Sequence, residues 1–497
     1  MNGTSVSEKV RAQFVGRQEA LDAFYLRFAY RHMKNGIYYC GGGGLGKTWI
    51  LQKIINDNQD DPIRIVTPII DFSDTRNHSV RGLQATISSC LQNPKAFEPY
   101  DEALERLEEA RSRLETHPSA IASLEARADK VFIQCCQDAI IGREVILLFD
   151  TFERVQQRHV GRWLCQEFLP QVGDLIVAIA GRPEPAPAQM PDNVVTYQLK
   201  GLDREAFVEL VRSRLPSASD EMVESIWRHT DGAPLMVNLI LDLHEPQRRQ
   251  FIARLSQLRE DERVQDSPEL QRWLVGQFAS PSDNRSNRAI WAMAYLRRRF
   301  DVPLLKYIVE NTTWFRPSDY EPILNDLRQL VYVKEYPPQQ NHLLHDQIQR
   351  MVVKYVLPDV GIWEEFRADL YDSVVNRYYP ESIKAIEEAP PDKKTLAVLG
   401  LARQLRAEQL GYILDQDPDA GLEKYESYRT EVEEKTHDYD FEELLWGEVR
   451  EHLDDWEEES GYDICDARGQ WLRRHSLFHK AEEHYRQMLD RFPERRV

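Results

Sequence analysis

A glycine-rich run that ends in lysine and threonine, Gly-Gly-Gly-Gly-Leu-Gly-Lys-Thr, occupies residues 41–48. Its spacing matches G-x-x-x-x-G-K-[ST], a loop that binds nucleotide phosphates. Glycines allow backbone N–H groups to surround phosphate oxygens, where a side chain would block the approach. Lys47 can reach the β- and γ-phosphates, and Thr48 can bind Mg²⁺. The residues expected to contact nucleotide here are Gly43, Gly44, Leu45, Gly46, Lys47, Thr48 and Trp49.

Two acids further along the chain could complete such a site. Residues 144–150 form an apolar run that ends in Asp150, which we expect to bind Mg²⁺ together with Thr48. Glu153 follows three residues later and could orient the attacking water. The alternative interpretations are a structural acid for Asp150 and an exposed loop acid for Glu153.

Arg182 follows a second buried apolar run, residues 174–180. At the C-terminal edge of a parallel sheet it would face the ligand crevice and could sense the γ-phosphate through charge-assisted hydrogen bonds. A surface arginine beside the turn residue Pro183 is the alternative. The sequence therefore predicts four catalytic side chains, those of Lys47, Asp150, Glu153 and Arg182.

The segments that carry these residues indicate an α/β fold. Strand patterns also occupy residues 36–40, 63–72 and 194–199, with helical patterns between them. Apolar strands without alternation, separated by helices, are typical of a parallel sheet covered on both faces. We predict a P-loop nucleotide-binding domain over residues 1–200, with a solvated helical insertion near residues 100–130. A bare glycine-rich turn at 41–48 is the alternative to the phosphate loop.

After residue 200 the pattern is almost entirely helical. We predict a helical lid domain over residues 201–283, in which Pro234 suits the first position of a helix. Residues 284–358 contain three helical patterns followed by a hairpin pattern, which predicts a winged-helix domain. The remaining residues, 359–497, are predicted to be an all-α sensor or interaction region.

The C-terminal region has two further patterns. Residues 431–463 contain fifteen acids and only two bases, which predicts an acidic solvated face of helices. Small, aromatic and proline residues from Gly469 to Pro493 have the spacing of a tetratricopeptide repeat (TPR), with an ordinary helical hairpin as the alternative. Residues 410–429 have a degenerate version of the same pattern. Because repeats need neighbours to bury their faces, we expect a longer protein of which this chain is a piece.

In the order of its motifs the chain resembles the STAND class of regulatory P-loop ATPases, which contains NB-ARC and NACHT (NLR-like) proteins. Phe14-Val15-Gly16-Arg17 resembles the N-terminal motif of that class, which places Phe14, Val15 and Arg17 near the adenine. Gly-Ala-Pro-Leu at 232–235 resembles its G-x-P-L motif, so that Pro234 would pack near the base. Asp150 and Arg182 match its Walker B acid and sensor arginine.

Leu-His-Asp at 344–346 resembles the Met-His-Asp motif of the winged helix in this class. The resemblance implies that His345 contacts the β-phosphate of ADP in a closed state. A local alternative is that Asp346 caps the helix that follows. One departure from the class is Thr151, which replaces a second acid after Asp150, so slow hydrolysis is expected and Glu153 would have to substitute.

Composition limits the other function classes. The chain has 497 residues, 42% hydrophobic and 29% charged, and a formal charge of −19, which argues against general affinity for nucleic acid or anionic membrane. Six scattered cysteines, without a signal peptide or a membrane-spanning apolar stretch, predict a reduced cytoplasmic protein. Cys135 and Cys136 are expected to fill a core.

The sequence thus favours an ATP/ADP-dependent signalling switch with Mg²⁺ as the metal cofactor. The resemblance implies closure with ADP, and opening with homo-oligomerisation on ATP, after a protein or small-molecule signal acts at the C-terminal helices. One alternative is an AAA+-type DNA-associated ATPase, in which residues 297–299, three arginines, would contact phosphates. The other is a nucleotide-binding scaffold without turnover.

Overall fold

A computed structural model describes residues 14–30, 35–61, 63–113, 117–182, 190–259, 261–330, 332–336, 341–390 and 396–495. The chain divides into two compact units, and each contains segments that are distant in sequence. The first unit comprises Met1–Asp74, Arg143–Gln157 and Gly173–Pro380. The second comprises Thr75–Gly142, Arg158–Val172 and Glu381–Val497.

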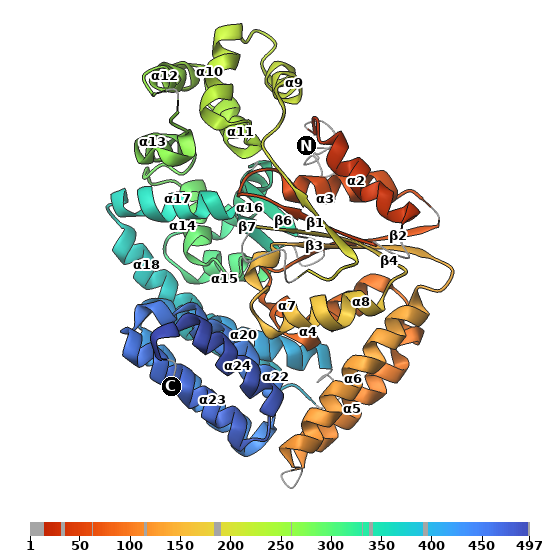
Figure 1. Cartoon of the computed structure of the whole chain (residues 1–497). Helices are drawn as coiled ribbons and strands as arrows, with labels where there is room; N and C mark the ends of the chain where they lie inside the picture. The colour runs from red at the N-terminus through yellow and green to blue at the C-terminus, as the bar shows by residue number, and fades with distance from the viewer. Residues whose placement is uncertain are drawn as a thin grey trace. The chain divides into compact units, whose positions relative to one another are not determined.

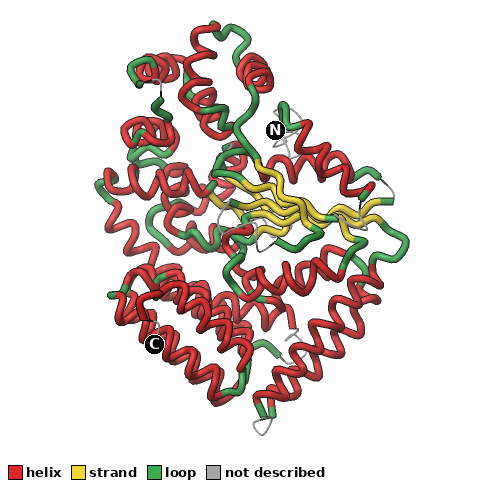
Figure 2. The backbone as a smooth tube through the Cα atoms, in the orientation of Figure 1, coloured by secondary structure: helices red, strands yellow, loops and turns green. Residues whose placement is uncertain are grey.

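The first unit is organised around one parallel sheet of five strands, drawn in yellow in Figure 2. The strands are β1 (Gly36–Cys40), β2 (Arg64–Asp71), β3 (Glu144–Asp150), β4 (Leu175–Gly181) and β5 (Val194–Gln198). Their spatial order is β2-β3-β4-β1-β5, and all neighbouring pairs are parallel. The predicted parallel sheet is confirmed, and it brings the ends of β1, β3 and β4 to adjacent positions.

Pro68 limits the pairing of β2. The register between β2 and β3 shifts between Val66 and Ile69, on either side of this proline, whose side chain is exposed. Because β2 is an edge strand, a residue without an N–H group is tolerated there. Pairing resumes after the shift, so that Asp71 lies opposite Asp150 at the C-terminal edge.

Helices α2 (Gln18–Ala29) and α3 (Lys47–Asn58) pack against this sheet (Figure 1). Ile50, Leu51 and Ile54 of α3 are fully buried, at the spacing that forms one face of a helix. They share a core with apolar strand residues such as Ile146 and Ala178. This packing fixes the N-terminus of α3 at the end of β1, where the glycine-rich run lies.

The rest of the first unit is mainly helical. Five helices follow the sheet: α9 (Arg204–Arg214), α10 (Asp220–Thr230), α11 (Pro234–Asp242), α12 (Glu245–Leu255) and α13 (Pro268–Phe278). Next come α14 (Arg285–Tyr295), α15 (Val302–Asn311), α16 (Tyr320–Gln329), the antiparallel hairpin β6 (Val333–Tyr336) and β7 (Asn341–Leu344), and α17 (Asp346–Tyr355). Three helices followed by a hairpin form the predicted winged helix, so the predicted fold class is confirmed. The segment ends with α18 (Trp363–Tyr371), a π-helical turn (Asp372–Tyr378) and α19 (Tyr379–Glu387), which reaches the second unit.

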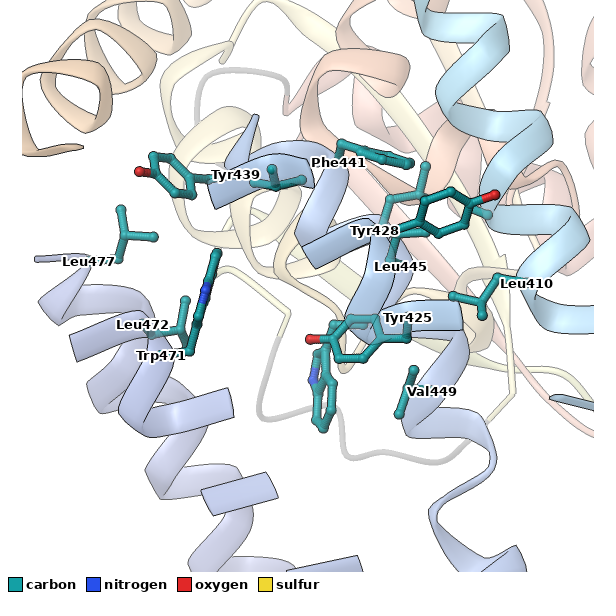
Figure 3. Packing of buried hydrophobic residues seen from close by; sticks show 14 of the residues in the cluster. Leu410, Tyr425, Tyr428, Tyr439, Phe441, Leu445, Val449, Trp471, Leu472 and Leu477 are labelled. Atoms are coloured by element: carbon teal, nitrogen blue, oxygen red, sulfur yellow. The ribbon is translucent and has the colours of Figure 1, made fainter. Parts of the chain in front are cut away.

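The second unit is entirely helical among its described residues. It contains η1 (Thr75–His78), α4 (Val80–Leu91), α5 (Pro94–Ser112), α6 (Pro118–Ala139) and the helix from His159 to Gln171, which has a π-helical centre. It also contains α20 (Leu396–Gln416), α21 (Pro418–Glu431), α22 (Tyr439–Glu451), α23 (Glu458–Arg474) and α24 (Phe478–Arg491). Figure 3 shows part of its core, where Tyr425, Tyr439 and Trp471 lie among leucines. Cys135 and Cys136 are buried as predicted.

The acidic segment 431–463 forms the predicted solvated face only in part: Glu434, Glu457 and Glu458 are exposed, whereas Glu442 and Glu448 are buried. Glu442 is 1% exposed, and its carboxylate accepts hydrogen bonds from the Arg468 guanidinium at 2.9 and 3.0 Å. Asp440 forms ion pairs with Arg81 at 3.4 Å and with Arg111 at 3.5 Å. These arginines come from α4 and α5, so the insertion near residues 100–130 is not simply solvated either.

The repeat-like pattern near the C-terminus corresponds to the helical hairpin of α23 and α24. A Cβ atom on Gly469 would lie 2.4 Å from the Tyr485 ring, so the small residue is needed for the two helices to pack. Gly421 in α21 packs equally closely against Leu414 of α20. Both hairpins therefore show the small-on-large packing that the spacing predicts.

No helix among the residues placed by the structure combines the length and apolarity needed to span a bilayer.

Candidate nucleotide site

The glycine-rich loop between β1 and α3 has the backbone that its sequence predicts. Gly44 and Gly46 have φ angles of 75° and 90°, which L side chains rarely adopt. A Cβ atom on Gly44 would lie 2.9 Å from Leu235. Lys47 folds back over the loop and donates to the carbonyl oxygens of Gly41 and Gly42 at 2.7 and 2.8 Å.

Thr48 and Asp150 lie together, as the predicted metal site requires. The Thr48 hydroxyl donates to Asp150 Oδ2 at 2.6 Å, and Asp150 is 2% exposed. The other carboxylate oxygen accepts from the backbone N–H of Thr151 at 2.8 Å. Both side chains offer the oxygen donors that Mg²⁺ prefers, and phosphates and water would complete its shell.

A second acid at this edge of the sheet, Asp71, was not predicted from the sequence. Thr151, in the left-handed region with φ 59°, donates its hydroxyl to Asp71 Oδ2 at 3.2 Å. Asp71 ends β2 directly opposite Asp150 and is 4% exposed. The position after Asp150 thus has a hydroxyl that binds an acid from the neighbouring strand. The local signal is that Asp71, like Asp150, ends an apolar strand.

Glu153 is not the exposed loop acid of the alternative interpretation. It lies in the short helix Phe152–Arg154 with a side chain 17% exposed. Its Oε1 pairs with Arg182 Nε at 3.0 Å, and its Oε2 accepts from the Arg182 backbone N–H at 3.2 Å. Burial raises the pKa of Glu153, while the Arg182 charge opposes this shift. In this arrangement both carboxylate oxygens are engaged by Arg182.

Arg182 likewise is more than a surface residue beside a turn. It follows β4, which lies between β1 and β3, and its Nη2 donates to Asp346 Oδ2 at 2.9 Å. Arg154 adds a weaker contact with Asp346, at 3.9 Å. Although burial alone would raise the pKa of Asp346, the nearby cations, Arg154 first, lower it overall. The expected sensor arginine therefore binds the first turn of α17.

His345 caps α17, and Asp346 does not, contrary to the local alternative. The Nδ1 atom of His345 accepts from the backbone N–H of Gln347 at 3.3 Å. Burial lowers the pKa of His345 to about 3, helped by the charges of Lys334 and Lys47. The ring is therefore neutral at pH 7, and because Nδ1 accepts, Nε2 carries the proton and can donate.

Lys334 is a second site residue that the sequence analysis does not identify. It lies in β6, and its Nζ is 3.7 Å from Asp150 Oδ2. Burial alone would lower its pKa, but the carboxylates of Asp150 and Asp71 raise it overall. The sequence around Lys334 gives no local signal of this contact, because Asp150 lies 184 residues earlier in the chain.

The Arg17 side chain contacts a backbone oxygen of the glycine-rich loop. Its Nη2 donates to Leu45 O at 2.9 Å, and its Nη1 donates to Lys200 O at 2.6 Å. The guanidinium therefore joins the glycine-rich loop to the chain that leaves β5. Desolvation lowers the pKa of Arg17.

The predicted lid motif also reaches the loop. The backbone N–H of Leu235 donates to Gly44 O at 3.1 Å, and Pro234 lies 3.8 Å from a Cβ built on Gly46. Gln347 of α17 approaches the same loop, with its Oε1 3.1 Å from a Cβ built on Gly44. Lid and winged helix therefore both contact the phosphate loop.

Three predicted nucleotide contacts are not joined to this network. Phe14 packs against the core of the first unit, as Leu45 does. Val15 and Trp49 have half-buried side chains, before α2 and in the first turn of α3 respectively. Their contact with a base stays a prediction.

The arrangement defines a class: a P-loop fold with a helical lid and a winged helix that close on the phosphate loop. The donor set fits a magnesium nucleotide, because backbone N–H groups, Lys47, Thr48 and Asp150 supply groups for both phosphate and metal. Within the described residues, no group of three or more His, Cys, Asp or Glu side chains could hold a metal ion by itself. In these features the chain resembles the STAND class.

Comparisons with family profiles and with curated proteins give no match. Among solved structures, the chain is similar to a STAND protein with a tetratricopeptide repeat sensor from Pyrococcus horikoshii. The identity is 17% and the TM-score 0.46, over 97% of this chain and 65% of that chain. A Walker-type ATPase of Pyrococcus abyssi is similar at 14% identity and a TM-score of 0.35, over 71% of this chain and 98% of that one. The chain thus spans 65% of the length of the first of these proteins.

Proposed function

We propose that this chain is a nucleotide-dependent switch of the STAND type, which binds ADP or ATP with Mg²⁺ at residues 43–48. The observation that carries the proposal is the contact of α17 with the site, through the Arg182–Asp346 ion pair at 2.9 Å. A nucleotide that binds unequally to the closed and open packings of the winged helix would shift the equilibrium between them.

The proposed roles follow from the geometry. Lys47 neutralises phosphate charge, Thr48 and Asp150 hold the metal ion, and Arg182 exchanges Asp346 for the γ-phosphate. The Nε2–H of His345 is a donor for a phosphate oxygen in the closed packing. Phe14, Val15, Arg17, Trp49 and Pro234 complete the proposed nucleotide contacts.

Hydrolysis is proposed to be slow. Thr151 leaves no acid next to Asp150, and the Glu153 carboxylate is occupied by Arg182. A water-orienting role for Glu153 therefore requires that Arg182 first move toward phosphate. In that case ATP would be hydrolysed only after the winged helix has opened.

The wider organisation is proposed as four parts: nucleotide-binding core (1–200), lid (201–283), winged helix (284–358) and helical sensor (359–497). A protein or small-molecule signal would act on the sensor, and ATP would favour a homo-oligomer. A cytoplasmic location is proposed with this function. The ion pairs between Asp440 and the arginines of α4 and α5 support a sensor that is coupled to helices inserted between the sheet strands.

The direct test is the nucleotide released when purified protein is denatured. Wild-type protein should release ADP or ATP in near-stoichiometric amount, and Lys47→Ala should release little. Lys53→Ala is the matched control, because Lys53 lies on the same helix and pairs only with Asp57 among the contacts described. Equal nucleotide content in the wild type and Lys47→Ala would reject the assignment.

The DNA-associated alternative gains no support from the three arginines. Arg298 is 6% exposed, and Arg299 pairs with Asp301 at 2.8 Å. Neither side chain is solvated, so neither presents a free cation to a phosphate backbone.

A further inference from the structure

Lys334 approaches the carboxylate oxygen that would serve the metal ion. Its Nζ lies 3.7 Å from Asp150 Oδ2, and the same oxygen accepts from the Thr48 hydroxyl at 2.6 Å. The two side chains are 20% and 3% exposed, so water screens this pair only partly. Lys334 is contributed by the winged helix, whereas Asp150 and Thr48 belong to the sheet and α3.

Lys334 lies among acidic and other basic side chains. Its electrostatic partners are Asp150, Asp71, Asp346 and Glu153. Three further cations interact with the same acids: Lys47, Arg154 and Arg182. A divalent cation beside Asp150 would place like charge next to Lys334.

Space next to Lys334 is also limited. A cavity of about 20 Å³ is lined by Ser73, Arg154, Lys334, Asp346 and Gln349, among others. Such a volume holds about one water molecule. Mg²⁺ keeps several waters when protein ligands are few, so this cavity, which neither Thr48 nor Asp150 lines, would not hold a hydrated ion beside Lys334.

We propose that Lys334 and Mg²⁺ are alternative partners of Asp150, so that the closed winged helix binds nucleotide without metal and metal binding expels the β6 strand. The inference rests on the proposed function and adds its regulation: the switch responds to the metal as well as to the nucleotide. By thermodynamic linkage, closure of the winged helix lowers the affinity for the metal ion. The metal ion lowers the equilibrium constant for closure by the same factor.

The test is metal binding to the ADP-loaded full chain, measured with Mn²⁺ as a paramagnetic substitute for Mg²⁺. Free Mn²⁺ is followed by electron paramagnetic resonance in wild type, Lys334→Met and Lys334→Arg. Lys306→Met is the matched control, because Lys306 lies on α15 of the winged helix and is 61% exposed. ADP content is measured in each sample by chromatography after denaturation.

Lys334→Met should bind Mn²⁺ at least about tenfold more tightly than wild type, which corresponds to about 1.4 kcal/mol. Lys334→Arg keeps the cation and should bind like wild type, as should Lys306→Met. Equal or weaker Mn²⁺ binding in Lys334→Met, with normal ADP content, would overturn this inference and leave the proposed function intact. Wild-type protein that cannot be loaded with ADP would overturn both.

Discussion

The guanidinium of Arg182 donates to the Asp346 carboxylate at 2.9 Å and pairs with Glu153 at 3.0 Å on its other side. Arg182 directly follows β4, at the centre of the sheet, and Asp346 begins α17. The arginine that we propose detects a γ-phosphate is therefore already bound to the winged helix. Detection of ATP and release of the winged helix would be one event, because Arg182 cannot satisfy both partners with the same N–H groups.

Asp346→Asn should weaken closure, because Arg182 would lose its charged partner on α17. The pair is about one-third exposed, so the expected cost is about 0.5–1 kcal/mol, or roughly a two- to fivefold faster release of ADP. Stopped-flow release of a fluorescent ADP analogue measures this rate. Glu321→Gln, at an exposed acid of the same domain, should leave it unchanged. A normal rate in Asp346→Asn would show that the ion pair does not stabilise the closed packing.

The capping and ligand roles of His345 can be separated by two substitutions. His345→Ala removes both, whereas His345→Asn retains a good N-cap but loses the Nε2 donor. If Nε2 binds phosphate, both variants should release ADP faster, by a factor corresponding to about 1–3 kcal/mol. Wild-type kinetics in His345→Asn would mean that His345 is only a helix cap.

Closure should also depend on pH through His345. Burial lowers the pKa of His345 to about 3 in this packing, whereas an exposed histidine has a pKa of about 6.5. The open state then binds the proton more readily, so closure loses stability as pH falls below about 6.5 and continues to lose it toward pH 3. ADP release should accelerate by at most about tenfold per pH unit in this window. The acceleration should disappear in His345→Asn; if it persists there, another group titrates.

Hydrolysis should be slow in the wild type and depend on Glu153. Glu153→Gln keeps the size of the side chain but removes the base and the charge that pairs with Arg182, so turnover should fall by about 10²-fold or more. Phosphate release under multiple turnover measures this effect. Glu144→Gln, at the start of the strand β3 that precedes Glu153, is the control. Wild-type turnover in Glu153→Gln would assign the base elsewhere, with Asp71 as the next candidate.

The second unit should depend on its buried ion pairs. Arg468 and Glu442 are 3% and 1% exposed, so Glu442→Gln leaves a buried cation with a weaker partner and should destabilise this unit by about 3 kcal/mol. Thermal unfolding followed by circular dichroism should show a transition at a lower temperature. Glu434→Gln, an exposed acid of the same acidic segment, should not shift it. An unchanged transition in Glu442→Gln would indicate that the pair contributes little.

The sequence was most informative where function and local pattern coincide. The apolar run ending in Asp150 predicted β3 with its exact end because strand and acid are contiguous. Gly44 and Gly46 were predicted because their backbone conformation requires glycine. The position of Arg182 at the sheet edge was predicted because it follows a buried strand in the chain.

The remaining site residues depend on contacts between distant segments. Lys334 reaches Asp150 only because the winged helix packs against the sheet edge, and Asp71 gains its role only because β2 pairs with β3. The ion pairs of the acidic segment were not predicted for the same reason, since the arginines that pair with Asp440 come from α4 and α5. Composition within a segment cannot reveal partners supplied from elsewhere.

The central claim is that nucleotide identity controls the packing of the winged helix on the phosphate loop. Hydrogen–deuterium exchange of residues 341–355 tests it most directly, in Glu153→Gln to prevent turnover and in Lys47→Ala as the non-binding control. With ADP these backbone amides should be protected, and with ATP and Mg²⁺ they should exchange faster, while Lys47→Ala shows no difference. Equal protection of this segment with ADP and with ATP and Mg²⁺, in protein that binds both nucleotides, would contradict the account.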